Sequence, residues 1–279
     1  LKDSGAEAII ILENFATTLE KVIGATDVKH VIVASMGDLL GFVKGSIVNF
    51  VVRNIKKLAP EFSLPNAIRF NKVIADASSM SLKPVEVKQE DVAFLQYTGG
   101  TTGLSKGATL LHKNVLANTL QSDVWLEPGL AQGAKVDQLV IVCALPLYHI
   151  FALTVNCLAM LKIGAHNVLI TNPRDMKAFI GDLAKKRFTV ITGVNTLFNG
   201  LLNQEAFGKL DFSGLKIAVG GGMAVQKATA EKWKAVTGVP LAEGYGLTET
   251  APLATCNPID GTERIGTIGM PLPNTEVMI

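Results

Sequence analysis

Residues 168–191 read VLITNPRDMKAFIGDLAKKRFTVI, and this stretch holds the pattern that decides the fold. It begins with the apolar run 168–170 and ends with the apolar run 189–191. Between them, residues 175–186 have the apolar spacing of an amphipathic helix. A strand, a helix and a second strand of this kind are typical of a parallel β-sheet that helices cover.

The same alternation extends along the chain in both directions. Further strands are predicted at 8–12, 30–34, 91–97, 139–144 and 215–219, and helices at 14–23, after His112, at 150–161 and at 225–236. The predicted fold class is therefore α/β, with mostly parallel sheets covered by helices on both faces. The polar segment 78–90 contains Pro84 and is the predicted boundary. It gives a first α/β portion, 1–83, and a second α/β portion, 84–279.

Composition excludes several classes of protein. The 279 residues are 48% hydrophobic and 18% charged, which excludes a disordered chain. The net charge of +2 gives no reason to expect nucleic acid as a partner. The three cysteines, Cys143, Cys157 and Cys256, have no metal-ligand spacing, so we expect reduced thiols in a cytoplasmic protein. The chain opens at Leu1 without a signal peptide and ends in a strand-like segment, so we expect a piece of a longer protein.

Residues 139–161 carry no charged side chain and are long enough to span a bilayer. Pro146, Tyr148, His149 and Asn156 interrupt the run, however. A buried strand, a loop and a buried helix are therefore predicted in place of a membrane span.

An amphipathic helix is predicted at about 38–58, within a stretch that contains no acidic residue from 39 to 60. Helical spacing places most apolar side chains on one side, with Arg53 and Lys56 opposite and Lys44 and Lys57 near the edge. Two interpretations are open. The helix either lies in an anionic membrane interface or packs its apolar side on the core.

The strongest signal for chemistry is residues 97–107, YTGGTTGLSKG, which follow a predicted strand and precede a predicted helix. The glycines allow close backbone approach to a ligand, the threonines supply hydroxyl groups, and Lys106 can reach phosphate oxygens. The loop is not a Walker A motif, because Gly107 and not a hydroxyl residue follows the lysine. The structural alternative is a glycine-rich surface turn.

A second signal is residues 243–250, EGYGLTET. Tyr245 stands between two glycines and could stack on a base, Thr248 could donate to a phosphate, and Glu249 could hold Mg²⁺. A packed loop is the alternative interpretation of this segment.

Together, the two motifs resemble signatures of the adenylate-forming superfamily, which contains acyl-CoA synthetases, luciferases and peptide-synthetase adenylation domains. Residues 145–152, 170–175, 191–197 and 220–223 are closely similar to bacterial long-chain fatty-acid–CoA ligases. Ser105 departs from the commonest family loop, in which proline precedes the lysine. The resemblance implies the large N-terminal domain of layered αβαβα subdomains, truncated at both ends. A ribose-binding aspartate and a mobile C-terminal domain would lie outside the chain.

The resemblance also implies roles for individual residues. Lys106, Thr248, Glu249 and His149 would be catalytic, with Glu249 on Mg²⁺ and His149 near the acyl carboxylate; outside its motif, such a histidine is more often a core residue. ATP contacts would come from Tyr97, Thr98, Gly99, Gly100, Thr101, Thr102, Gly103, Leu104, Ser105, Lys106, Gly107, Ala108, Gly220, Gly221, Gly222, Glu243, Gly244, Tyr245, Gly246 and Thr248. Residues 265–271, IGTIGMP, would help to shape the acyl channel.

The implied activity is ATP-dependent activation of a long-chain fatty acid to an acyl-adenylate and then to acyl-CoA. The implied cofactors are ATP, Mg²⁺ and coenzyme A as co-substrate. A homodimer and peripheral contact with the inner face of the cell membrane are further expectations. Three alternatives stay open: an adenylation domain for another carboxylic acid, a nucleotide-binding module without chemistry, and an inert fragment whose sites are incomplete.

Overall fold

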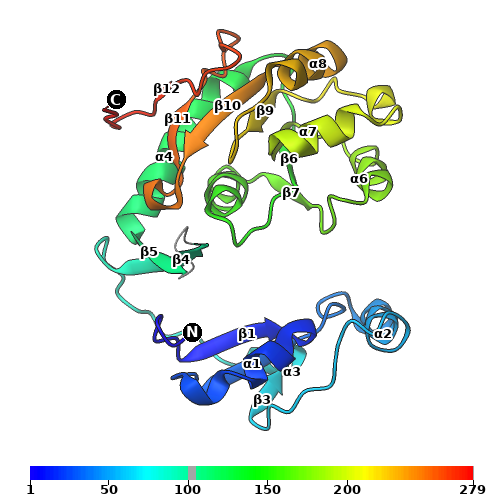
Figure 1. The fold of residues 1–279 in the computed structure, drawn as a ribbon, viewed down its shortest axis with the longest axis vertical. Coiled ribbons are helices and arrows are strands. Elements are labelled where there is room, and N and C mark those ends of the chain that lie inside the picture. Colours follow the sequence, from blue (N-terminus) through cyan, green and yellow to red (C-terminus); the bar gives the residue numbers. More distant parts are fainter. Residues whose placement is uncertain (100–104, 279) are drawn as a thin grey trace. The chain divides into compact units, whose positions relative to one another are not determined.

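The computed structural model describes residues 1–99 and 105–278. The chain divides into two compact units, Leu1–Glu86 and Val87–Ile279 (Figure 1). This division lies inside the polar segment 78–90, near the expected boundary after residue 83. Each unit has its own sheet and its own cluster of buried hydrophobic side chains.

The first unit is built on a parallel three-stranded sheet in the order β1-β2-β3. Its strands are β1 (Ala8–Leu12), β2 (His30–Ala34) and β3 (Ala67–Arg69). Its helices are α1 (Ala16–Glu20), α2 (Phe42–Phe50), the π-helix η3 (Val51–Ile55) and α3 (Phe70–Ala77). The expected strands at 8–12 and 30–34 are confirmed, because their apolar side chains pack with Leu19 in the core of this unit.

The second unit is built on a seven-stranded sheet in the order β12-β11-β10-β9-β8-β6-β7. Five strands are parallel: β6 (Val140–Cys143), β7 (His166–Leu169), β8 (Val190–Gly193), β9 (Ile217–Gly220) and β10 (Leu241–Gly246). Two antiparallel strands, β11 (Leu253–Cys256) and β12 (Met270–Pro271), extend one edge. The prediction of a mostly parallel sheet is therefore confirmed.

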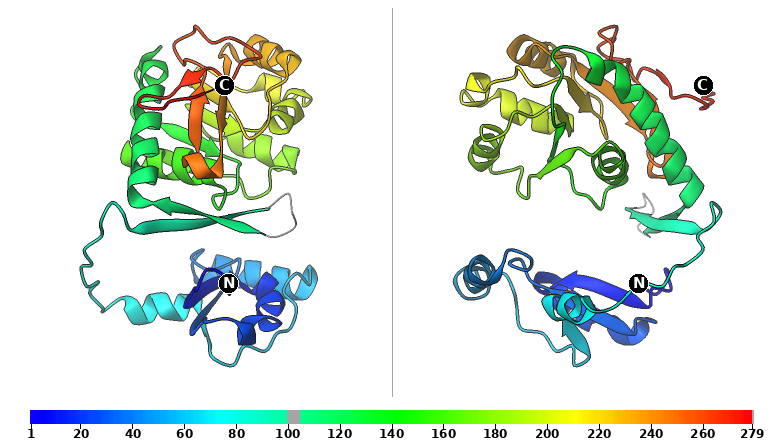
Figure 2. Two further views of the ribbon diagram at one scale, coloured as in Figure 1. Left: turned by 60° about the vertical axis from the view of Figure 1, so that its left-hand side comes forward. Right: turned by 180° about the vertical axis from the view of Figure 1, so that it is seen from behind.

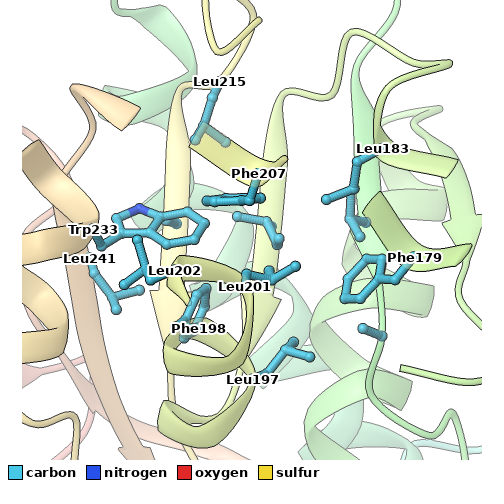
Figure 3. Close-up of a cluster of buried hydrophobic side chains, with 14 of the residues drawn as sticks. Phe179, Leu183, Leu197, Phe198, Leu201, Leu202, Phe207, Leu215, Trp233 and Leu241 are labelled. Atoms are coloured by element: carbon cyan, nitrogen blue, oxygen red, sulfur yellow. The ribbon is translucent and has the colours of Figure 1, made fainter. Parts of the chain in front are cut away.

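Helices cover both faces of this sheet, as predicted. On one face, α6 (Met176–Leu183), α7 (Asn195–Leu202) and α8 (Lys227–Thr237) bury a large core. Figure 3 shows Trp233 and Phe198 in this core, with ring centroids 4.9 Å apart. On the other face lie α4 (His112–Ala131) and the π-helix η4 (Ala152–Ala159), which continues into α5 (Met160–Lys162) (Figure 2). Successive residues of a strand point to opposite faces of the sheet. In β6, Ile141 packs in the cluster under α4 and η4, and Val142 packs in the cluster under α6, α7 and α8.

An antiparallel hairpin of β4 (Val92–Thr98) and β5 (Lys106–Leu111) precedes α4. The expected helix after His112 is confirmed, because α4 begins at that residue, and β5 lies between the helix and the glycine-rich motif. Lys106, Gly107 and Ala108 therefore belong to a strand. They pair in register with Thr98, Tyr97 and Gln96 of β4.

Residues 139–161 form β6, a loop and η4, as predicted. Among the helices of the described residues, none has the length and apolar content needed to cross a membrane.

Cys143 and Cys256 are buried and form no disulfide. Burial raises the pKa of the Cys143 thiol to about 11 and that of the Cys256 thiol to about 12, so both remain protonated near neutral pH.

Candidate active site

A cavity of about 530 Å³ lies at the carboxyl ends of β9 and β10. Its volume falls within the range of about 300–1,000 Å³ that is usual for small-molecule sites. In parallel α/β sheets, ligands bind at this edge because loops and helix starts gather there. The cavity is lined by Thr98, Gly99, Lys106, His149, Ile150, Phe151, Val219, Gly221, Gly222, Gly244, Gly246, Leu247, Thr248, Glu249, Pro252 and Leu253.

The β4–β5 hairpin contributes Thr98, Gly99 and Lys106 to the cavity wall. Thr98 and Lys106 are directly opposite each other in the strand register, so the pairing of the two strands fixes their spacing. Five further predicted contacts lie outside the described residues: Gly100, Thr101, Thr102, Gly103 and Leu104. Within its described residues, the hairpin therefore presents one ammonium group and one hydroxyl group to the cavity.

The end of β10 contributes Thr248 and Glu249 through the short 3-10 turn η6 (Thr248–Thr250). The hydroxyl of Thr250 holds this turn. Its oxygen accepts a hydrogen bond from the Leu247 N–H at 2.9 Å, and it donates to the Pro252 carbonyl. Thr154 of η4 donates to the Ala251 carbonyl at 3.0 Å, which ties the turn to the buried helix. Thr248 and Glu249 are thus held in a turn that hydrogen bonds fix on both sides.

Several predicted contacts lie outside the cavity wall. Glu243 is buried, and its Oε1 accepts a hydrogen bond from the Val225 N–H at 3.1 Å. Burial raises the pKa of this carboxyl group. Because successive residues of β10 point to opposite faces, Glu243 anchors the segment before α8 while Gly244 lines the cavity. The Glu243 side chain therefore has an anchoring role, and a nucleotide contact for this residue stays a prediction.

Tyr97, Ser105, Gly107, Ala108, Gly220 and Tyr245 also do not line the cavity. Tyr97 pairs with Gly107 across the hairpin, and its ring lies against that glycine. Tyr245 follows Gly244 on β10 and is about half exposed. Because of strand alternation it is displaced from the two glycines that line the cavity, and its stacking on a base stays a prediction.

His149 enters the cavity from the loop that follows β6. Its Nδ1 accepts a hydrogen bond from the Phe151 N–H at 3.2 Å. In the neutral imidazole, the proton then lies on Nε2, which makes Nε2 a hydrogen-bond donor. This arrangement suits a group that orients a carboxylate, and it removes the alternative of a wholly buried core histidine.

Sequence reasoning missed Asn118, which is 3% exposed on α4. Its Nδ2 donates to the Leu253 carbonyl at 2.7 Å, and its Oδ1 accepts from the Leu253 N–H at 3.0 Å. The amide therefore satisfies both backbone groups of a residue that lines the cavity. An asparagine inside a helix carries no sequence signal for this role, because its partner lies 135 residues away.

Replacing Asn118 with leucine is expected to lower the free energy of unfolding by about 2–4 kcal/mol, because both backbone groups of Leu253 lose their buried partner. Urea unfolding measures the loss, and hydrogen exchange at the Leu253 amide locates it. Asn199→Leu, at an exposed position of α7, is the matched control. Equal stability of the two variants would contradict this role for Asn118.

A smaller apolar recess adjoins the cavity and shares Phe151, Val219 and Leu253 with it. It lies between α4, η4 and the sheet and has an open volume of about 20 Å³. Its remaining lining residues are Ser122, Trp125, Leu126, Val155, Cys256 and Ile259. None of these side chains carries a charge, and the volume of the recess is smaller than the roughly 30 Å³ that one water molecule takes up in the liquid.

Glu249 is the one carboxylate among the described residues that line the cavity. Within residues 1–99 and 105–278, no three His, Cys, Asp or Glu side chains are grouped to hold a metal ion. A single carboxylate fits Mg²⁺, which commonly takes one or two protein carboxylates and completes its shell with water and phosphate oxygens.

A model of the family described as AMP-binding enzyme matches residues 1–279. Two bacterial relatives named long-chain-fatty-acid–CoA ligase align over 100% of the chain: that of Haemophilus influenzae at 51% identity and that of Escherichia coli O6:H1 at 53%. The chain covers 49% of each, so it spans about half the length of the curated relatives that it matches.

Solved structures match the fold as well. The anthranilate CoA ligase in complex with anthranoyl-AMP aligns with a TM-score of 0.76 at 22% identity, over 98% of this chain and 47% of that chain. A long-chain-fatty-acid–CoA ligase from Archaeoglobus fulgidus aligns with a TM-score of 0.67 at 26% identity, over 97% of this chain and 48% of that chain. The expected fold class is confirmed.

Proposed function

Because the chain belongs to the family of AMP-binding enzymes, we propose that its cavity joins ATP and a fatty acid to form an acyl-adenylate. The observation that carries the proposal is the meeting of three distant segments. The hairpin supplies Lys106, the loop after β6 supplies His149, and the turn after β10 supplies Thr248 and Glu249. Sites of this kind, with a few polar groups converging on one cavity, are suited to binding and orienting two substrates.

The main barrier to this reaction is electrostatic, because a carboxylate must approach a polyphosphate and both are anions. A carboxylate oxygen bonds to the α-phosphorus of ATP while the bond to pyrophosphate breaks. Lys106 would offset the phosphate charge, and the hydroxyls of Thr98 and Thr248 would donate to phosphate oxygens. Glu249 would hold Mg²⁺, which when bound neutralises charge that develops on the phosphate oxygens.

The proposed acid is a fatty acid because the relatives that match the whole chain are named long-chain-fatty-acid–CoA ligases, and because Phe151, Val219 and Leu253 give the cavity an apolar side. His149 Nε2 would donate to the carboxylate, while Phe151 and Val219 would contact the part of the hydrocarbon chain next to it. An amino-acid substrate would need a charged side chain to hold its amine, and the lining of the recess offers none. Displacement of AMP by the thiol of coenzyme A would complete the synthesis of acyl-CoA, as the names of the relatives suggest.

Exchange of labelled pyrophosphate into ATP tests this function in the full-length protein. We expect exchange that depends on palmitate and Mg²⁺, because adenylation is reversible before coenzyme A is added. Benzoate and free amino acids serve as matched acids without a long hydrocarbon chain. ATP binding without exchange for any acid would favour a nucleotide-binding module, and exchange with an amino acid alone would favour the other adenylation domains.

A further inference from the structure

The segment formed by α2 and η3 exposes most of its apolar side chains and contacts the rest of the first unit through Gly45, Asn49 and Arg53. Phe42, at the start of α2, is 90% exposed. We define the outer apolar face as the exposed hydrophobic side chains of this segment and its two flanks: Leu39, Phe42, Val43, Ile47, Phe50, Ile55 and Leu58. The alternative that this helix packs its apolar side on the core is wrong for these residues.

An ion cluster around one buried carboxylate holds the opposite side of the segment. Glu13 is 2% exposed and receives hydrogen bonds from Arg53 Nε and Nη2, both at 2.9 Å. Arg69 Nη1 adds a third at 2.9 Å, and Arg53 Nη2 also reaches Ser35 Oγ. Although burial opposes it, the hydrogen bonds from the two arginines hold the pKa of Glu13 below its usual value. Arg53, expected opposite the apolar side, therefore anchors the segment to Glu13, while its own side chain is 42% exposed.

Close backbone contact fixes the same orientation. A Cβ atom at Gly45 would lie 2.4 Å from the Gly37 carbonyl oxygen, so only glycine permits this approach. Beside it, the Gly37 N–H donates to Asn49 Oδ1 at 2.7 Å. Because Gly45, Asn49 and Arg53 all face inward, rotating the helix to bury the outer apolar face would break each of these contacts.

The charged side chains within residues 39–60 are all basic, and Asp38 and Glu61 flank this stretch. No acidic residue occurs from 39 to 60, and exposed lysines lie at both ends of the segment: Lys44 in α2, and Lys56 and Lys57 after η3. A second copy docked through this face would bring the lysines of both copies together, which is unfavourable. An anionic surface complements them.

We propose that the outer apolar face inserts into the interface of an anionic lipid bilayer, with Lys44, Lys56 and Lys57 at the level of the lipid phosphates. A basic helix with Phe, Ile and Leu on one side lies in the plane of such an interface and does not span it. The proposal goes beyond the activity proposed above and does not depend on it. Membrane docking would bring the protein to a surface in which hydrocarbon-rich acids dissolve.

Flotation of the full-length protein with vesicles tests the proposal. Binding is expected to vesicles of phosphatidylcholine with phosphatidylglycerol, and weaker binding to phosphatidylcholine alone. Changing Phe42, Ile47 or Phe50 to serine should weaken partitioning by about tenfold each, because each variant loses the favourable transfer of an exposed apolar side chain from water to lipid. Changing Lys44, Lys56 or Lys57 to glutamine should weaken it by about fivefold each, on anionic vesicles only.

Leu161→Ser is the matched control, because Leu161 is also an exposed apolar residue but lies in α5. A Phe50→Trp variant adds a direct readout, since its fluorescence should shift to the blue only when anionic vesicles are present. Unchanged flotation of the serine variants would overturn the proposal, as would a tryptophan that is already shielded without vesicles. Pyrophosphate exchange measured without vesicles reports separately on the proposed activity, so the two can fail independently.

Discussion

Replacing Lys106 with alanine is expected to slow palmitate-dependent pyrophosphate exchange in the full-length protein by about 10²–10³-fold. Lys106 is the one cationic side chain among the described residues of the cavity wall, and strand pairing with Thr98 fixes its position. Without it, the approach of a carboxylate to the polyphosphate loses the protein's own positive charge. The effect should fall mainly on the rate at saturating ATP, since the charge matters most in the transition state.

Two further variants sharpen this test. Lys177→Ala, at an exposed position on α6, should leave the rate unchanged. Glu249→Gln should also slow exchange, but with a rise in the Mg²⁺ concentration needed for half-maximal rate, which Lys106→Ala should not show. A loss below about twofold for Lys106→Ala would remove this lysine from the site.

The parallel sheet could be predicted because its strands are buried on both faces. All four residues of β8 and of β9 are buried, and a strand of this kind reads as a continuous apolar run. Helix α7 could not be predicted so readily. Its sequence, NTLFNGLL, contains two asparagines and a glycine, which favour a helix weakly. The burial of Phe198 and Leu201 in the core overrides that preference.

The orientation of α2 shows a second limit of sequence patterns. Periodicity predicted the helix and the side on which its apolar residues gather. Which side faces inward depends on Glu13, a buried carboxylate 40 residues before Arg53. A charge that must be paired when buried outweighs the burial of several apolar side chains, and no local pattern contains that information.

In the candidate active site as well, some residues could be predicted from the sequence and others depend on tertiary structure. Both glycine-containing motifs could be predicted because their residue types are unusual, and Thr98, Lys106, Thr248 and Glu249 line one cavity. The strand β5 could not be predicted from the loop motif, since its pairing depends on β4. The roles of Pro252 and Leu253 also depend on tertiary structure, because they reach the cavity only when β11 turns back beside β10.

Gly246→Ala is expected to slow pyrophosphate exchange by more than about 10²-fold. At Gly246, a Cβ atom would lie 2.0 Å from the Pro252 carbonyl oxygen and 2.8 Å from its carbonyl carbon. Both are backbone atoms, so no side-chain rotation relieves the clash. The pairing of Gly246 with Leu253 must open, and the turn that carries Thr248 and Glu249 must move. A displacement of about 1 Å at a reacting group can cost about 10²-fold in rate.

The control is Gly181→Ala in α6, where a Cβ atom would meet no heavy atom within 4 Å. This variant should keep the full rate and gain up to about 1 kcal/mol of stability, because alanine favours a helix more than glycine does. Hydrogen exchange should show for Gly246→Ala a loss of protection at Leu247, whose N–H donates to the Pro252 carbonyl at 3.0 Å, and none in β8. A rate within about threefold of the unmodified protein would mean that the turn after β10 does not position the reacting groups. Loss of protection in β8 as well would mean that the glycine supports the whole sheet, and the effect on rate would then follow from unfolding.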